Sequence, residues 1–188
     1  GNGLNARGLV QGTGPGYALD QGLLRAQAVT LVLRCQGNAP AEETSAAPTA
    51  TSFTDVPAGH WAEASVRQAV SQGITNGTSA KTFDPDRTLT LAEFMTFLLR
   101  AMGYTDITPE NCYTSAELAG FDPAQMQTLR TLNRDLLRAD VVALCYESLN
   151  CNTADARGWT LKETLLFDGV IQSQNLTEGL GKLPPLLQ

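Results

Sequence analysis

Apolar residues recur with a helical period in three separate stretches of the chain, which begin at Leu23, Leu89 and Leu136. When the stretches are aligned, apolar side chains occupy positions i, i+1 and i+4 in each, and this spacing is typical of one face of an α-helix. The pattern therefore predicts three equivalent helices whose apolar faces need partners. The aligned positions are Ala28, Val29 and Val32 in the first stretch, Phe94, Met95, Leu98 and Met102 in the second, and Val141, Val142, Cys145 and Leu149 in the third.

The ends of these helices carry local sequence signals. Each stretch is followed by a residue that tolerates a left-handed backbone, at Gly37, Gly103 and Asn150, and such residues often end helices. At the other end, Thr90 and Glu93 have the spacing of a capping box, in which each side chain bonds to the backbone N–H of the other. By alignment, the predicted helix starts lie near Leu24, Thr90 and Leu137.

The middle stretch also shows what precedes such a helix. A shorter helix of about 12 residues is predicted from His60 to Gly73, followed by a loop over residues 74–85. The sequence thus predicts an all-α fold of three helix–loop–helix repeats, with the second helices in a central, pseudo-threefold bundle. The predicted organisation is an N-terminally truncated repeat 1 at 1–37, a linker at 38–52, repeat 2 at 53–104, a degenerate repeat 3 with a terminal helix at 105–171, and a tail at 172–188.

The third repeat departs from this plan in its loop. Asp122-Pro123 combines a capping residue with proline at a first helical position, which predicts a short extra helix in place of a glycine-rich loop. Thr160 and Glu163 form a second capping box, so a last helix is expected to start at Thr160 and to stop at Gly169.

Composition and charge restrict the possible partners. The 188 residues are 43% hydrophobic and carry a net charge of −6, so they can bury a core but do not favour a nucleic-acid partner. No run of about 18 apolar residues occurs, and no membrane insertion is expected.

The four cysteines lack metal-ligand spacing. Cys145 takes a core position in the helix alignment, and a Cys112–Cys151 bridge is conceivable.

No enzyme signature is present. His60 is the only histidine, and its place beside Trp61 at a predicted helix start favours capping or surface packing over catalysis. Asp84-Pro85-Asp86 is typical of a turn and does not continue into a calcium loop. The loop glycines lack the Lys-Ser/Thr of a phosphate-binding loop. We therefore expect no enzymatic activity, no cofactor and no metal site.

Two arginines invite a functional interpretation. Arg25 and Arg138 occupy equivalent positions at the start of a predicted helix, where a cation is mildly unfavourable next to the positive end of the helix dipole. A bound anion would make such a position favourable. The alternative is that each arginine pairs with a neighbouring acid such as Asp140, and the sequence leaves both possibilities open.

The middle repeat resembles the S-layer homology family, whose modules occur in threes on bacterial cell surfaces. The resemblance is strongest across about fifty residues, is recognisable in the first copy from Gly8 to Gly37, and is good in the third from Leu136 to Leu149. The matching residues are Phe53, Asp55-Val56, His60-Trp61-Ala62, Gly73-Ile74, Gly77, Phe83, Pro85 and Leu89 to Phe94.

The resemblance implies a pseudo-threefold helical domain that anchors a surface protein to the cell wall without a covalent bond. Its implied ligand is a secondary cell-wall polysaccharide with acidic substituents such as pyruvate ketals, held in grooves between repeats. The implied location is extracellular, at the cell wall of a Gram-positive-type bacterium. The binding residues that the resemblance implies are Arg25, Arg138, Asp55, Trp61, Gly12 and Gly77.

No repeat carries the complete family motif. Leu91 stands where the family has arginine, and Gln27 and Asp140 stand where it has glutamate. These departures keep a second hypothesis open, a structural protein–protein interaction module of a surface protein whose glycan grooves have decayed. Self-association is not decided by the sequence.

Overall fold

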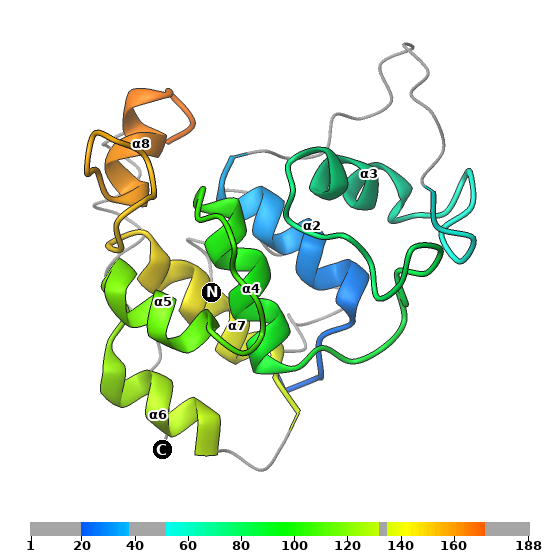
Figure 1. Ribbon diagram of the computed structural model, residues 1–188, viewed down its shortest axis with the longest axis horizontal. Coiled ribbons are helices and arrows are strands. Elements are labelled where there is room, and N and C mark those ends of the chain that lie inside the picture. Colours follow the sequence, from blue (N-terminus) through cyan, green and yellow to red (C-terminus); the bar gives the residue numbers. More distant parts are fainter. Residues whose placement is uncertain (1–19, 38–51, 132–134, 172–188) are drawn as a thin grey trace.

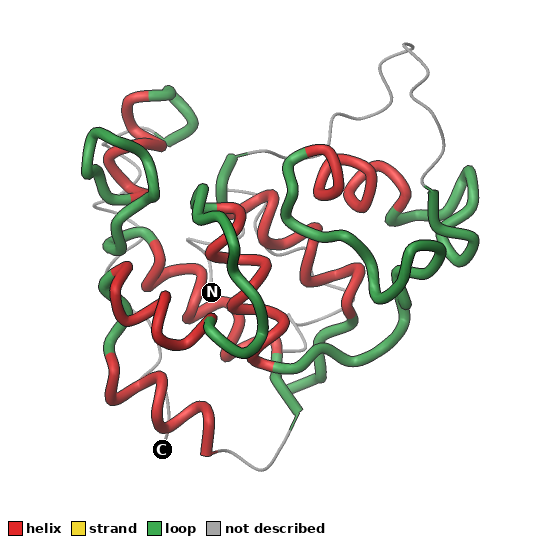
Figure 2. Tube along the Cα trace, viewed as in Figure 1, coloured by secondary structure: helices red, strands yellow, loops and turns green. Residues whose placement is uncertain are grey.

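The computed structural model describes residues 20–37, 52–131 and 135–171. Its described part is helical and contains no strand, only three isolated bridges between extended residues (Figure 2). The all-α prediction is therefore confirmed. The helices are α2 (Arg25–Cys35), α3 (Glu63–Ser71), α4 (Leu91–Ala101), α5 (Cys112–Ala119), α6 (Pro123–Thr131), α7 (Arg138–Ser148) and α8 (Leu161–Phe167) (Figure 1).

The predicted helix starts are confirmed, because they depend on local capping. Leu24, Thr90 and Leu137 are the residues immediately before α2, α4 and α7. Thr90 Oγ1 accepts a hydrogen bond from the Glu93 backbone N–H at 3.2 Å, and the Glu93 carboxylate accepts one from the Thr90 N–H at 3.1 Å. The last helix starts with the equivalent pair, Thr160 and Glu163, and α6 begins at Pro123, as its sequence predicts.

One predicted helix start was wrong, and one helix ends in a different conformation from the one expected. The helix expected from His60 begins at Glu63 and has nine residues, because the chain makes turns through residues 57–62, where the His60 carbonyl accepts from the Glu63 N–H at 2.9 Å. The end of α7 does not use a left-handed residue. Gly37 and Gly103 have φ of 72° and 92°, whereas Asn150 is not among the positive-φ residues of the described chain.

The core forms where the second helices meet. Helix α2 contacts α3, α4 and α7, and α4 contacts α5 (Figure 1). The equivalent residues Val32, Leu98 and Cys145 are all buried, so the helical periodicity correctly identified the inward faces. All four cysteines are free thiols in the structure, and no Cys112–Cys151 bridge is formed.

The division into three repeats stays a prediction. The contacts of α2 with both α4 and α7 agree with a central bundle, but they do not establish repeat boundaries. Most of the predicted linker, residues 38–51, and the whole tail at 172–188 lie outside the described residues, as does the first part of repeat 1. Within the described part, no helix combines the length and apolar character needed to cross a bilayer.

Candidate functional site

The starts of α2, α4 and α7 meet in a cyclic order. In each case, the first residue of one helix lies beside the third residue of the next, or lines a cavity with it. Each meeting point is called a junction below and is named by its two helices. The residue pairs are Arg25 with Glu93 at the α2/α4 junction, Leu91 with Asp140 at the α4/α7 junction, and Arg138 with Gln27 at the α7/α2 junction.

Backbone hydrogen bonds hold this arrangement together. The extended segment before α2 runs between the segments that precede α4 and α7, where the Leu23 N–H donates to the Leu136 carbonyl and the Leu89 N–H donates to the Leu23 carbonyl, both at 3.2 Å. The Arg138 N–H donates to the Gln21 carbonyl at 3.0 Å. The first turns of the three helices are therefore fixed relative to one another by the main chain.

The α2/α4 junction is closed by a buried ion pair. Arg25 Nη1 lies 3.0 Å from Glu93 Oε1, and the Arg25 side chain is only 5% exposed. Its guanidinium carbon lies 5.0 Å and 4.8 Å from the ring centroids of Phe83 and Phe97. Burial lowers the pKa of Arg25, and the charge of Glu93 offsets part of that effect. Arg25 therefore has a fixed carboxylate partner, the alternative that the sequence left open.

Glu93 receives more than one charged hydrogen bond. Arg87 Nη1 donates to Glu93 Oε2 at 3.1 Å, and the Thr90 N–H donates to the same oxygen. Burial alone raises the pKa of Glu93, but the hydrogen bonds from Arg87 and Thr90 and the charges of both arginines outweigh it and lower the pKa to about 2. Glu93 is thus ionised at neutral pH and serves as both a helix cap and a counter-ion.

Two other predicted ligand residues hold the loop around Phe83. The Asp55 carboxylate accepts from the backbone N–H groups of Phe83 at 3.0 Å and Asp84 at 2.7 Å. Gly77 has φ of +82°, and a Cβ there would lie 2.5 Å from the Phe53 ring and 2.6 Å from the Thr82 carbonyl oxygen. The local roles of Asp55 and Gly77 are therefore to fix this loop in its conformation.

The loop is connected to Arg25. Arg25 Nη2 approaches Thr75 Oγ1 at 3.5 Å, and Thr75 Oγ1 accepts from the Gly77 N–H at 3.2 Å. The Phe83 backbone N–H donates to the Asp55 carboxylate, and the Phe83 ring packs against the Arg25 guanidinium. The structure thus brings three predicted ligand residues into one network, whose hydrogen bonds are directed within the protein.

Trp61 is the most exposed of the predicted ligand residues that the structure describes. It is 57% exposed and its ring centroid lies 5.7 Å from that of His60. His60 Nδ1 accepts from the Ala62 N–H at 3.2 Å within the turn before α3, and no side-chain hydrogen bond caps the start of that helix, so the capping role predicted for this histidine was wrong. No described hydrogen bond or ring contact connects Trp61 with Arg25 or Arg138. Gly12, the remaining predicted residue, lies outside the described residues.

Arg138 has a different environment from Arg25. It is partly buried at the start of α7, and its Nη2 donates to the neutral Gln27 Oε1 at 3.2 Å. Like Arg25 Nε, its Nε is buried without a hydrogen-bond partner, but unlike Arg25 it forms no ion pair with a carboxylate in the described part of the chain. A buried donor without a partner costs free energy. The α7/α2 junction therefore contains a cation with unused hydrogen-bonding capacity.

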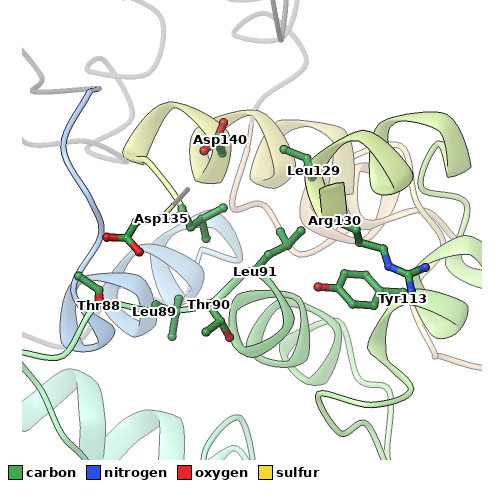
Figure 3. A pocket seen from close by; sticks show the side chains of 10 residues that line it. Thr88, Leu89, Thr90, Leu91, Tyr113, Leu129, Arg130, Asp135 and Asp140 are labelled. Atoms are coloured by element: carbon green, nitrogen blue, oxygen red, sulfur yellow. The ribbon is translucent and has the colours of Figure 1, made fainter. Parts of the chain in front are cut away.

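The α4/α7 junction contains a cavity of about 190 Å³ (Figure 3). Leu91 and Asp140 line it from α4 and α7, so the cavity lies where the other junctions have an arginine. Arg130 from α6 and Tyr113 from α5 line it as well, and the Arg130 guanidinium carbon lies 4.5 Å from the centroid of the Tyr113 ring. The other lining residues are Thr88, Leu89, Thr90, Leu129, Asp135 and Leu136.

The sequence did not indicate Arg130, Tyr113 or the second role of Glu93. Glu93 forms a complete local capping box, and its ion pair with Arg25 spans 68 positions of sequence. Arg130 and Tyr113 lie on separate helices with no shared motif, and only the packing of α5 and α6 brings them together. The extra helix predicted at Pro123 was a signal that this region differs from the other repeats.

Comparison with known proteins identifies a family for the middle of the chain. Residues 52–95 match the family model of the S-layer homology domain. This region contains α3, the loop around Phe83 and the first turns of α4. The match confirms the family resemblance.

Bacterial surface proteins are similar over a larger part of the chain. A cell surface protein of Thermoanaerobacter kivui is 35% identical over 105 residues, which are 55% of this chain and 14% of that protein. The middle cell wall protein of Brevibacillus brevis (strain 47) is 29% identical over 175 residues, 87% of this chain and 16% of that protein. A surface layer protein of Brevibacillus choshinensis is 35% identical over 102 residues, 54% of this chain and 9% of that protein.

Each alignment thus spans a small part of the relative's own length. Together the matches support a location at the bacterial cell surface.

Proposed function

We propose that this chain, which carries an S-layer homology domain at residues 52–95, anchors a surface protein to the cell wall by binding an acidic wall polysaccharide at the α7/α2 junction. The anchoring is non-covalent, and the implied host is a bacterium of the Gram-positive type. Arg138 carries the proposal, because it combines a helix start, a neutral partner in Gln27 and a buried Nε without a hydrogen-bond partner.

The chemistry of this junction suits a carboxylate. A guanidinium can bind a carboxylate through two parallel hydrogen bonds, and the first turn of α7 adds the positive end of a helix dipole. The Arg138 side chain donates one hydrogen bond within the described chain, so other guanidinium donors remain for a ligand. By the same reasoning, Arg25 is a positioning residue, since Glu93 already neutralises it, and Asp55 and Gly77 act through the loop that they fix.

The test is a wall-binding assay with the full chain. Intact cell walls should retain the protein, whereas walls stripped of their secondary polymer with hydrofluoric acid should not. Arg138→Ala should weaken retention by about ten- to a hundredfold, because a hydrogen bond to a charged group contributes roughly 1.5–3 kcal/mol. Arg138→Lys should lose nearly as much, since lysine lacks the planar fork.

Arg67→Ala is the matched control, because it removes one arginine from a half-buried pair with Glu63 within α3, far along the sequence from α7. It should leave wall binding unchanged.

A protein-interaction module is the second candidate function, and the closed α2/α4 junction favours it, because an ion pair occupies the position that a glycan would need. Wall binding that is insensitive to Arg138→Ala, in a correctly folded variant, would favour this second function.

A further inference from the structure

Two of the four cysteines lie next to each other where α2 packs against α7. Cys35 is the last residue of α2, Cys145 lies within α7, and the two helices are in contact. Both cysteines are free thiols, and their side chains are hydrogen-bonded to each other. A hydrogen bond from Arg138 to Gln27 joins the starts of the same two helices. The thiol pair of Cys35 and Cys145 is therefore a second point at which α2 and α7 meet.

The two thiols differ in their access to solvent. Cys35 is partly exposed, whereas Cys145 is buried with only 6% of its surface exposed. The hydrogen bond with Cys35 and burial raise the pKa of the Cys145 thiol well above its ordinary value. A thiol attacks a disulfide as the thiolate and must first reach it. A dissolved disulfide should therefore react with Cys35 first, and Cys145 then lies beside the sulfur that has reacted.

The other two cysteines have main-chain partners. Cys112 Sγ donates to the Pro109 carbonyl at 3.3 Å, and Cys151 Sγ donates to the Glu147 carbonyl at 3.5 Å. Both side chains are buried, and burial raises the pKa of Cys112 to about 11 and that of Cys151 to about 12. These are the features of inert core thiols, so Cys112 and Cys151 provide an internal comparison for the thiol pair.

The cellular location and the topology favour a bridge between the paired thiols. The similarity to bacterial surface proteins supports a location at the cell surface, and disulfides form and persist in such compartments. A bridge from Cys35 to Cys145 would enclose α3, α4, α5 and α6 in one covalent loop. A cross-link that closes a long loop restricts the unfolded chain strongly, so this bridge should stabilise the contact of α2 with α7.

We propose that Cys35 and Cys145 form a thiol–disulfide exchange site, which takes a small-molecule disulfide as its oxidant and forms a bridge between α2 and α7. This inference does not depend on the proposed function, because neither cysteine is among the residues assigned to the polysaccharide.

The reaction has two exchange steps. The Cys35 thiolate attacks one sulfur of the small disulfide, which gives a mixed disulfide on Cys35 and releases one small thiolate. The Cys145 thiol then loses its proton and its sulfur attacks the Cys35 sulfur, which releases the second small thiolate. The two protein thiols thereby lose two electrons to the small disulfide, and the two protons that they lose pass through water to the released thiolates.

The test is to treat the reduced full chain with oxidised glutathione, to alkylate the remaining thiols and to map the peptides by mass spectrometry. Trypsin combined with a protease that cleaves after Glu147 separates Cys145 from Cys151. We expect the free thiols to fall from four per chain to two, with Cys35 and Cys145 in one cross-linked pair of peptides. Four remaining thiols, a Cys112–Cys151 bridge, or glutathione retained on Cys35 would overturn the proposal.

Variants test the order of the two steps. Cys145→Ser should stop the reaction with one glutathione on Cys35, whereas Cys35→Ser should leave Cys145 as a free thiol. Cys112→Ala is the matched control, because it removes a buried thiol outside the pair, and it should form the bridge as the wild type does. Glutathione on Cys145 in the Cys35→Ser variant would contradict the assignment of Cys35 as the first thiol to react.

A stability measurement tests whether the bridge fits the native packing. Oxidation should raise the urea midpoint of the wild type and leave that of Cys145→Ser unchanged. An unchanged or lower midpoint in the bridged wild type would contradict a bridge that fits the native contact of α2 with α7.

Discussion

The α2/α4 and α4/α7 junctions are built from equivalent helix starts, yet one is filled and the other is hollow. Both place an acidic residue at the third position of the following helix, Glu93 in one and Asp140 in the other. They differ at the first position of the preceding helix. Arg25 reaches its acid and is buried between two phenylalanine rings, whereas Leu91 and Asp140 line the walls of a cavity.

The comparison indicates that the side chain at the first helix position determines whether a junction is closed and buried or open as a cavity. A long cation neutralises the facing carboxylate and completes the packing. A leucine is too short and too apolar to do either, so space remains and neighbouring helices supply the charge. The presence of the family arginine therefore does not by itself identify an open binding groove.

The largest expected effect comes from breaking the closed junction. Glu93→Gln leaves the buried Arg25 without a counter-charge, and removing one partner of a buried pair costs about 3–5 kcal/mol. Urea unfolding should show this loss as a lower midpoint with an unchanged slope. Arg67→Ala breaks a half-buried pair between residues one helical turn apart, in which Arg67 is 29% exposed against 5% for Arg25, and it should cost about 1 kcal/mol or less. Equal costs for the two variants would contradict a special role for the Arg25–Glu93 pair.

Lowering the pH should reduce the free energy of unfolding by a smaller amount. The pKa of Glu93 is about 2 in the folded protein, against about 4.3 for a glutamate in an unfolded chain. Glu93 therefore stabilises the fold above about pH 4.3, and this contribution is lost as the pH falls toward 2. Its size should be about 2 kcal/mol, less than the pKa difference alone implies, because the side chain is 20% exposed and screened by solvent.

The measurement is the free energy of unfolding between pH 2 and pH 6 for the wild type and Glu93→Gln. The two curves should approach each other as the pH falls, because protonation removes the charge that the variant already lacks. Curves that stay parallel over this range would show that the Glu93 charge does not stabilise the α2/α4 junction.

The smallest expected effect comes from converting the hollow junction into the closed type. Leu91→Arg places a guanidinium opposite Asp140, as Arg25 stands opposite Glu93. In a double-mutant cycle with Asp140→Asn, we expect a favourable coupling of about 1 kcal/mol between the introduced guanidinium and the Asp140 carboxylate. Zero coupling would mean that the first helix position does not control this junction.

Local features of this fold were predictable from the sequence, and long-range ones were not. The starts of α4 and α8 follow from Thr-x-x-Glu spacing within one helical turn, and the buried positions follow from the apolar period. The pairing of Arg25 with Glu93 could not be predicted from local spacing, because the two residues lie 68 positions apart. The capping box with Thr90 was already a sufficient explanation for Glu93. Assigning Arg25 to a ligand and Glu93 to a cap explained each residue separately and overlooked their pairing.

The same limit applies to the candidate site. The sequence indicated Arg138 through its repeat position, and the structure adds that its described partner is the neutral Gln27. The cavity at the α4/α7 junction depends on the shape left by Leu91 and on the docking of α5 and α6. These are properties of tertiary packing, for which the chain offers no short motif.

The hydrogen bonds that join the three helix starts also set the order in which the chain can fold during synthesis. Helix α2 leaves the ribosome before α4 and α7, but the Leu23 N–H finds its acceptor at Leu136, and Arg138 meets Gln27 across 111 positions of sequence. Contacts of such long range form late, because the intervening chain must first be closed into a loop. The apolar face of α2 therefore stays incompletely covered until α7 has been made, and a chain that stops before α7 keeps that face exposed to aggregation.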